Sequence, residues 1–152
     1  MRRFGLSAVA CAVALVIMAV TPAAAFKRVR YSTGPFVVNC RSDSTPQICD
    51  PPKKLKIRVR HGKVRIKRLR YVASTEHCSS GRVLVSLDGE RIGRTDWVNA
   101  GERATVDDLK VTLHHGRHTF AFRIQGRTGG CNVGSVVSWG GKIKLSGRKF
   151  SG

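Results

Sequence analysis

Between Lys53 and Arg70 the chain reads KKLKIRVRHGKVRIKRLR, in which apolar and cationic residues alternate on both sides of a His61-Gly62 pair. Alternation with a period of two is typical of a β-strand that buries one of its faces. The stretch therefore predicts two strands joined by a two-residue hairpin turn at His61-Gly62, with the glycine in the left-handed conformation. One face of this hairpin is expected to be apolar and the other wholly cationic.

A β-bulge is expected in the second of these strands. The apolar phase slips by one residue there, because Leu69 and Tyr71 continue it, so we place the bulge near Lys67 and Arg68, where it brings Leu69 opposite Leu55. The apolar face is predicted to comprise Leu55, Ile57, Val59, Val64, Ile66 and Leu69. The outer face is predicted to hold eight cations, namely Lys54, Lys56, Arg58, Arg60, Lys63, Arg65, Lys67 and Arg70.

This concentration of charge indicates an anionic partner. Like charges directly opposite each other on a sheet cost roughly 0.2 to 1 kcal/mol per pair, so stability alone does not favour the cationic face. The whole chain is also basic, with 28 Lys and Arg, 9 Asp and Glu, and a net charge of +19. A solvated face in a protein that is basic everywhere is the alternative interpretation.

The first residues predict export. Met1-Arg2-Arg3 is followed by an apolar run from Ala8 to Val20 and by small residues that end at Ala25, which is typical of a signal peptide cleaved before Phe26. Removing residues 1–25 lowers the net charge from +19 to +17, because Arg2 and Arg3 are lost. The mature protein is expected to be secreted: extracellular, periplasmic or associated with the cell wall.

Four cysteines remain after cleavage, and an even number in an exported chain favours two disulfides. Three pairings exist. We favour Cys40 with Cys49, which closes a local loop, and Cys78 with Cys131, which joins the ends of two core segments. A metal site is the alternative, although the chain has no Cys-x-x-Cys pair.

The fold is predicted to be all-β, an antiparallel β-sandwich of about seven strands. Residues 26–52 contain Gly34-Pro35 and Pro51-Pro52 and are expected to be an irregular arm, whereas short strand signals recur at about ten-residue spacing through the domain expected over 53–152. After the basic hairpin, strands are expected at 82–87, 90–94, 105–113, 117–125 and 135–145. Their core-facing residues are predicted to be Val83, Val85, Leu87, Leu109, Val111, Leu113, His118, Phe120, Phe122 and Ile124. If the last strand pairs beside the first, Lys142 and Lys144 extend the basic face.

Two segments within this domain, VLVSLDGERIG at 83–93 and LHHGRHTF at 113–120, carry a family resemblance. They resemble a pattern of secreted bacterial β-sandwich modules, shared by immunoglobulin-like domains and jelly-roll carbohydrate-binding modules. The resemblance covers residues 82–139. It implies the sandwich fold, and in its carbohydrate-binding form it implies sugar binding through aromatic side chains.

The glycine-rich stretch at 126–141 offers a second candidate site. Its functional interpretation is a ligand pocket with Arg127, Asn132 and Trp139 at the rim. The alternative is a disulfide-braced loop in which Trp139 plugs the core.

Catalytic and metal-binding patterns are weak. His114, His115 and His118 have no carboxylate in their immediate sequence neighbourhood, and Ser146-x-x-Lys149 stands without its companion motifs. We therefore expect no enzyme activity, no cofactor and no metal.

The leading hypothesis is a secreted binding module for anionic polymers, such as a cell-envelope glycopolymer, lipopolysaccharide or another extracellular polyanion. No specific nucleic acid is expected, because the basic stretch lacks interleaved aromatic residues apart from Tyr71. One alternative is a membrane-active, antimicrobial-type cationic protein that contacts an anionic membrane surface. Another is an accessory module that binds a neutral carbohydrate at Trp97 or Trp139.

Overall fold

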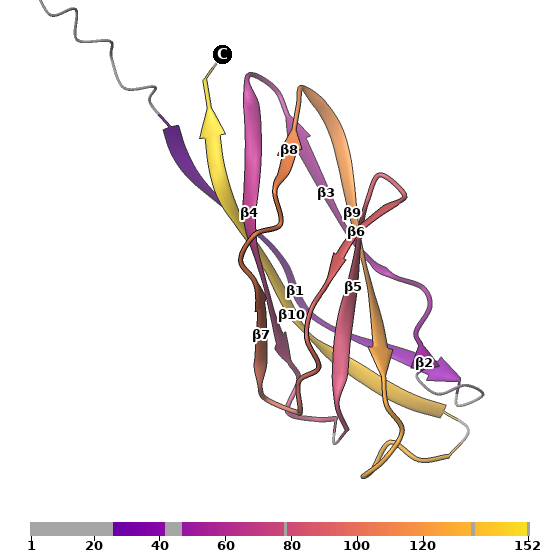
Figure 1. Ribbon diagram of the computed structural model, residues 1–152. Helices are drawn as coiled ribbons and strands as arrows, with labels where there is room; N and C mark the ends of the chain where they lie inside the picture. Colours follow the sequence, from indigo (N-terminus) through magenta and orange to yellow (C-terminus); the bar gives the residue numbers. More distant parts are fainter. Residues whose placement is uncertain (1–25, 42–46, 78, 135, 152) are drawn as a thin grey trace, which may run out of the picture.

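The computed structural model describes residues 26–41, 47–77, 79–134 and 136–151, which form ten antiparallel strands and no helix (Figure 1). The all-β prediction is confirmed. No helix in these residues has the length and apolar composition needed to cross a membrane. The strands are β1 (Phe26–Arg41), β2 (Gln47–Ile48), β3 (Lys53–Val59), β4 (Lys63–Ala73), β5 (Gly81–Leu87), β6 (Glu90–Arg94), β7 (Arg103–Val106), β8 (Val111–Leu113), β9 (Gly116–Gly126) and β10 (Val136–Phe150).

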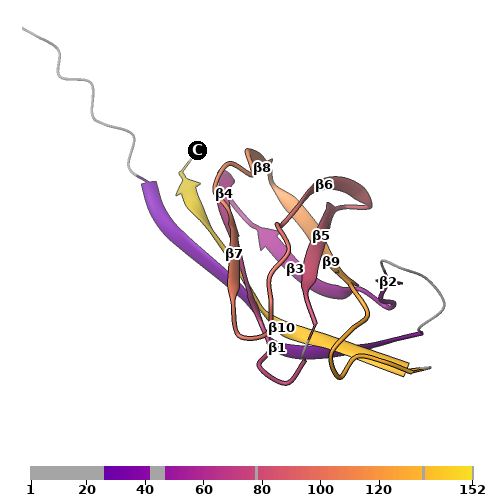
Figure 2. The same cartoon turned by 60° about the horizontal axis from the view of Figure 1, so that its bottom comes forward.

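The strands form two five-stranded sheets. In the first, here called sheet A, β10 lies between β1 and β4, and the other edge of β4 is shared by β7 and β8. In the second, sheet B, β9 lies between β5, which is followed by β6, and the edge shared by β2 and β3. Figure 2 shows β1 and β10 running side by side as the longest strand pair.

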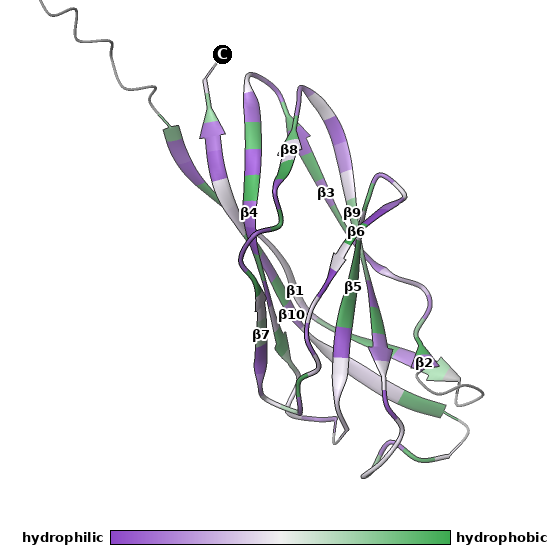
Figure 3. Cartoon of the chain, viewed as in Figure 1, coloured by the Kyte–Doolittle hydropathy of each residue, from purple (hydrophilic) through white to green (hydrophobic). Residues whose placement is uncertain are grey.

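One hydrophobic core is shared by both sheets. Sheet A contributes Tyr71 and Trp139, and sheet B contributes Phe120 and Phe122, all of them fully buried. The alternation of hydropathy along β4 is visible as bands in Figure 3, and the buried residues of this strand are Val64, Ile66, Leu69, Tyr71 and Ala73. Most of the predicted core is confirmed, while Leu55, Leu87, Val111 and His118 are only partly buried.

The predicted hairpin is wrong. β3 pairs with β9 in sheet B, whereas β4 pairs with β10, β7 and β8 in sheet A, so His61-Gly62 connects the two sheets. A type I′ hairpin turn needs positive φ at both central residues, and of these two only Gly62 has it, at 68°. The alternation identified the buried face of each strand, but a period of two does not identify the partner strand.

The predicted bulge is confirmed in position, with different partners. Ser146 lies opposite Arg68 and Gly147 opposite Ile66, so Lys67 is the extra residue of β4 relative to β10. Lys67 and Arg68 are both exposed, and the backbone N–H of Leu109 donates to the Lys67 carbonyl at 3.1 Å. Leu69 lies opposite Leu145 and Val106 rather than opposite Leu55.

The expectation of an irregular arm over residues 26–52 is wrong for residues 26–41. Residues 26–41 form β1, which pairs with β10 and so belongs to the folded domain. Gly34 and Pro35 do not end the strand, because the register shifts between Ser32 and Pro35 and Gly34 takes a φ of 70°. Proline is tolerated there since β1 is an edge strand.

Two further predictions concern the turn at Asp88-Gly89 and the strand expected over 105–113. The Asp88-Gly89 turn is confirmed, with φ of 51° and 94° at its two residues, as a type I′ turn requires. The strand expected over 105–113 is instead two strands, β7 and β8, separated by a segment in which Lys110 has a φ of 45°.

The Cys40–Cys49 disulfide is confirmed, with a Cα–Cα distance of 4.7 Å. It joins the end of β1 in sheet A to the residue after β2 in sheet B. The second predicted pair includes Cys78, which lies outside the described residues.

Candidate anion-binding surfaces

The eight cations predicted to form one surface lie on two sides of the molecule. The outer face of each sheet is the face turned away from the shared core. From β3, the outer face of sheet B carries Lys54, Lys56 and Arg58; from β4, the outer face of sheet A carries Lys63, Arg65 and Arg70. Arg60 lies in the connection between these strands, and Lys67 lies in the bulge. The predicted two-row hairpin surface is therefore wrong.

A larger basic surface covers three adjacent strands of sheet A. In one row across the strands, Arg148 of β10 lies between Arg28 of β1 and Arg65 of β4. In another row, Lys144 lies opposite Arg70. Residues paired across a sheet project from the same face. We call this the sheet A basic surface, and it comprises Arg28, Arg30, Lys63, Arg65, Arg70, Lys142, Lys144 and Arg148.

This surface is free of acidic residues within its own strands, since β1, β4 and β10 contain no Asp or Glu. Directly after β7, at the edge of the sheet, Asp107 forms an ion pair with Arg68. None of the eight cations takes part in an ion pair with a described residue. Within the described part of the chain, the positive charge of the surface is therefore not balanced by ion pairs.

An open hollow of about 530 Å³ lies on this surface. Its cations are Arg70, Lys144 and Arg103, and its one acidic residue is Glu102. Glu102 accepts a hydrogen bond from the backbone N–H of Asn99 at 2.8 Å. The hollow is thus a place where a negatively charged group could contact cations from β10, β4 and β7.

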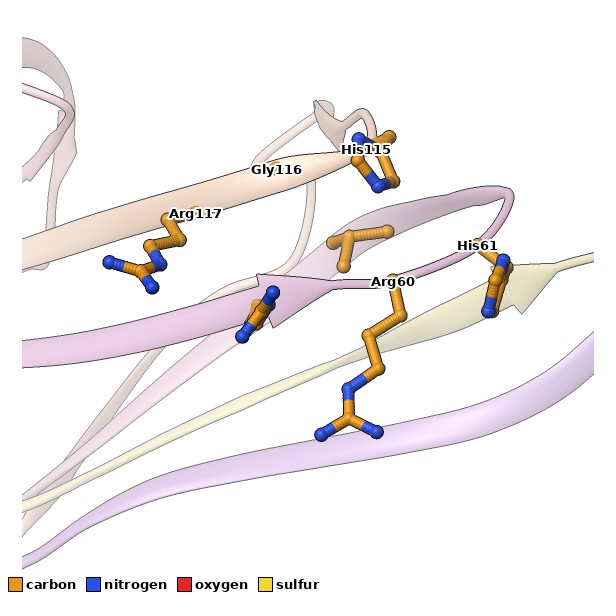
Figure 4. Close-up of a pocket in the computed structure, with 7 residues that line it drawn as sticks. Arg60, His61, His115, Gly116 and Arg117 are labelled. Atoms are coloured by element: carbon orange, nitrogen blue, oxygen red, sulfur yellow. The ribbon is translucent and has the colours of Figure 1, made fainter.

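A smaller hollow of about 230 Å³ lies at one end of sheet B (Figure 4). Arg58 and Arg117 lie opposite each other there, on β3 and β9. The other ionisable residues that line it are Arg60, His61 and His115. Figure 4 shows the side chains of Arg60 and Arg117 extending in different directions, so their guanidinium groups do not face a common point.

The predicted pocket of Arg127, Asn132 and Trp139 does not form in the described residues. Trp139 is fully buried, and a Cβ at Gly126 would lie 2.2 Å from its ring. Asn132 is also buried, and its amide donates to Ser79 Oγ at 2.9 Å. Arg127 is exposed and lies over the ring of Trp97 instead. Trp139 is therefore part of the core, as in the alternative interpretation of the glycine-rich stretch.

His118 is held between two acceptors. Its Nδ1 lies 2.8 Å from Asp88 Oδ2 and its Nε2 lies 3.0 Å from the carbonyl oxygen of His114. Both ring nitrogens donate only in the protonated form. Burial lowers the pKa of His118, but the hydrogen bonds to Asp88 and to the His114 carbonyl outweigh it and leave the pKa raised. The pKa of Asp88 is lowered, mainly by the hydrogen bond from the Thr119 backbone and then by His118.

Within the described residues, no group of three or more His, Cys, Asp or Glu side chains is arranged to hold a metal ion. His114 and His115 are exposed, and His118 is occupied by Asp88.

Sequence reasoning missed the contribution of β1 to the basic surface. Arg28 and Arg30 alternate with Val29 and Tyr31, which is the same strand signal as in the basic stretch. The alternation is short, and the following Gly34-Pro35 led to the prediction of an irregular arm. The sequence did suggest that Lys142 and Lys144 extend a basic face, and they do so beside β4.

Comparisons with known proteins give no family. No family model matches the chain, and no curated protein matches it. Among solved structures, the core of Drosophila NLP, described in connection with pentamer formation and histone binding, aligns with 82% of this chain and 98% of its own. The identity is 17% and the TM-score is 0.39.

Proposed function

We propose that this chain is an exported, non-enzymatic binding module of immunoglobulin-like or jelly-roll type that holds extended anionic polymers on the sheet A basic surface. The observation that carries the proposal is the row of Arg28, Arg148 and Arg65 on three neighbouring strands, together with the lack of acids in those strands. Like charges in adjacent positions disfavour folding, and an anionic ligand removes that repulsion.

The geometry suits a repeating polyanion. Cations on the same face recur at about 6.7 Å along a strand and about 4.8 Å between strands, so negative groups along a polymer can contact several of them at once. Arginine is common on the surface, and its planar fork binds phosphate, sulfate and carboxylate through two hydrogen bonds. Candidate ligands are cell-envelope glycopolymers, lipopolysaccharide and other extracellular polyanions.

Export is supported by the pattern of residues 1–25 and by the Cys40–Cys49 disulfide, because disulfides persist in oxidising compartments. The two alternative functions lack such support. A membrane-active hairpin would need the apolar side of the basic stretch, but Ile57, Val59, Val64 and Ile66 are buried in the core. A neutral-sugar site would need an open aromatic face, but Trp139 is buried, and the guanidinium groups of Arg82 and Arg127 lie over the ring of Trp97.

The test compares two variants of equal charge. Arg65→Gln, Lys144→Gln and Arg148→Gln remove three cations from the sheet A basic surface, while Lys54→Gln, Lys56→Gln and Lys110→Gln remove three exposed cations elsewhere. Binding to polyphosphate and to heparin is measured from about 50 to about 500 mM salt. The wild type should bind less tightly as salt increases.

The sheet A variant should lose at least about tenfold in affinity, and its plot of log affinity against log salt should flatten by about two units. The control variant should retain most of the affinity. Equal losses in the two variants would show that binding follows net charge alone and would refute the proposed surface.

A further inference from the structure

The guanidinium groups of two arginines lie over the ring of Trp97 on the outer side of sheet B. The Cζ atom of Arg82 lies 4.6 Å from the centre of the Trp97 ring, and that of Arg127 lies 4.3 Å from it. Arg82 comes from β5, and Arg127 follows β9. Trp97 is only partly buried, so this arrangement is accessible from solvent.

Both arginines are held in place by further hydrogen bonds. Arg82 Nε donates to Gln125 Oε1 at 2.7 Å, and these two residues lie opposite each other on β5 and β9. The backbone N–H of Arg127 donates to the Ser80 carbonyl at 3.0 Å. The Trp97 ring and Gln125 both restrain the guanidinium group of Arg82, and the ring alone restrains that of Arg127, so binding a ligand costs less side-chain freedom than it would at unrestrained arginines.

Two more arginines add charge to the same place. Arg94 lies opposite Leu84 and Arg91 opposite Ser86, which puts both on the face of sheet B that carries Arg82. Burial, followed by repulsion from Arg94, Arg91 and Arg127, lowers the pKa of Arg82. Although Glu90 and Asp96 are close in sequence, no described acid forms an ion pair with any of the four arginines.

We propose that Arg82, Arg91, Arg94, Arg127 and Trp97 form a second anion site that binds one phosphate or sulfate group. This site, here called the Trp97 site, is separate from the sheet A basic surface and does not depend on it. A carboxylate has two acceptor oxygens, whereas phosphate and sulfate have three or four and can accept hydrogen bonds from more arginines at once. The group can be a free ion or part of a polymer.

Fluorescence provides a direct readout, because the chain has two tryptophans and the other, Trp139, is fully buried. The titrants are sodium sulfate, sodium phosphate and a heparin tetrasaccharide, each at an ionic strength held constant with sodium chloride. A saturable change in emission with the free salts indicates a site for the free ion. A change with the tetrasaccharide alone indicates a site for a polymer-borne group. No change with any of the three would overturn the proposal.

Three variants test the assignment. Arg94→Gln removes an exposed cation and should weaken binding by about tenfold. Arg127→Lys keeps the charge but removes the planar fork, and it should also weaken binding. Arg65→Gln with Lys144→Gln alters the sheet A basic surface alone and should leave the titration unchanged. Wild-type affinity in Arg94→Gln and Arg127→Lys would refute the site, provided that thermal melts show both variants to be folded.

Discussion

His118 is the side chain whose charge depends most clearly on its surroundings. It lies between Asp88 Oδ2 and the His114 carbonyl, and 17% of its side chain is exposed. Its raised pKa means that the folded state binds the proton more tightly than the unfolded state, where the ordinary value is 6.5. The resulting stability is fully present below that value and is lost as pH rises through the folded-state pKa.

We therefore predict that the melting temperature falls as pH rises from about 6 to about 8. Asp88 adds a second limit, because its lowered pKa gives stability that is lost as pH falls through the folded-state value, below 3.8. Asp88→Asn can still accept the Thr119 hydrogen bond but loses the charge, so its melting temperature should change much less between pH 6 and 8. Equal pH profiles for the wild type and Asp88→Asn would contradict this account.

Gly126 is a residue where any side chain would enter the core. An added Cβ would lie 2.2 to 2.5 Å from three atoms of the Trp139 ring, and that ring is fully buried. We predict that Gly126→Ala lowers the free energy of unfolding by about 2 kcal/mol or more. Gly93→Ala is the control, because its Cβ would meet only Leu109 at an ordinary 3.6 Å. Urea denaturation of both variants checks the prediction, which fails if the two lose the same stability.

At the level of the strands, the sequence predicted buried faces better than partners. Residues Val64, Ile66 and Leu69 are buried as their alternation indicates, and the phase slip located the bulge at Lys67. The same pattern could not show that β3 and β4 belong to different sheets, because either pairing buries the same side chains. The sequence therefore predicted which residues are cationic and exposed, but not that they divide between two faces.

β1 was missed for a related reason. An isolated Gly-Pro pair usually ends a strand, but here an edge position and a register shift accommodate it. Those conditions depend on the partner, β10, whose Lys142 lies opposite Pro35 and comes more than one hundred residues later in the chain. Much of the candidate site could not be predicted, since it depends on such long-range pairings.

The Cys40–Cys49 disulfide links elements of the two sheets. Cys40 lies at the end of β1, and the backbone N–H of Cys49 donates to Ile124 in β9 at 2.9 Å. Replacing both cysteines with serine should lower the free energy of unfolding by about 2 to 3 kcal/mol. Without the cross-link, the unfolded chain is no longer restricted by a closed loop and gains conformational entropy. Denaturant unfolding of this variant tests the value. An unchanged midpoint would show that the link adds no stability.

At the level of the whole molecule, the two proposed anion sites lie on opposite sides. The sheet A basic surface and the Trp97 site are each on the outer face of their sheet, and the shared core lies between them. A polymer molecule bound on one side leaves the other site accessible to a second polymer molecule. A module with two such sites can link separate polymer molecules, whereas a module with one site can only coat a polymer.

We predict that the protein cross-links polyanions. Mixed with a sulfated polymer such as heparin, it should increase light scattering to a maximum at an intermediate ratio, and excess polymer should reverse the increase because each site then holds a different chain. The variant with Arg65→Gln, Lys144→Gln and Arg148→Gln, and separately the Arg94→Gln variant, should each scatter less while still binding the polymer through the remaining site. The Lys54→Gln, Lys56→Gln and Lys110→Gln variant is the control for loss of charge. Full scattering in both single-site variants would show that cross-linking arises from overall charge rather than from two opposed sites.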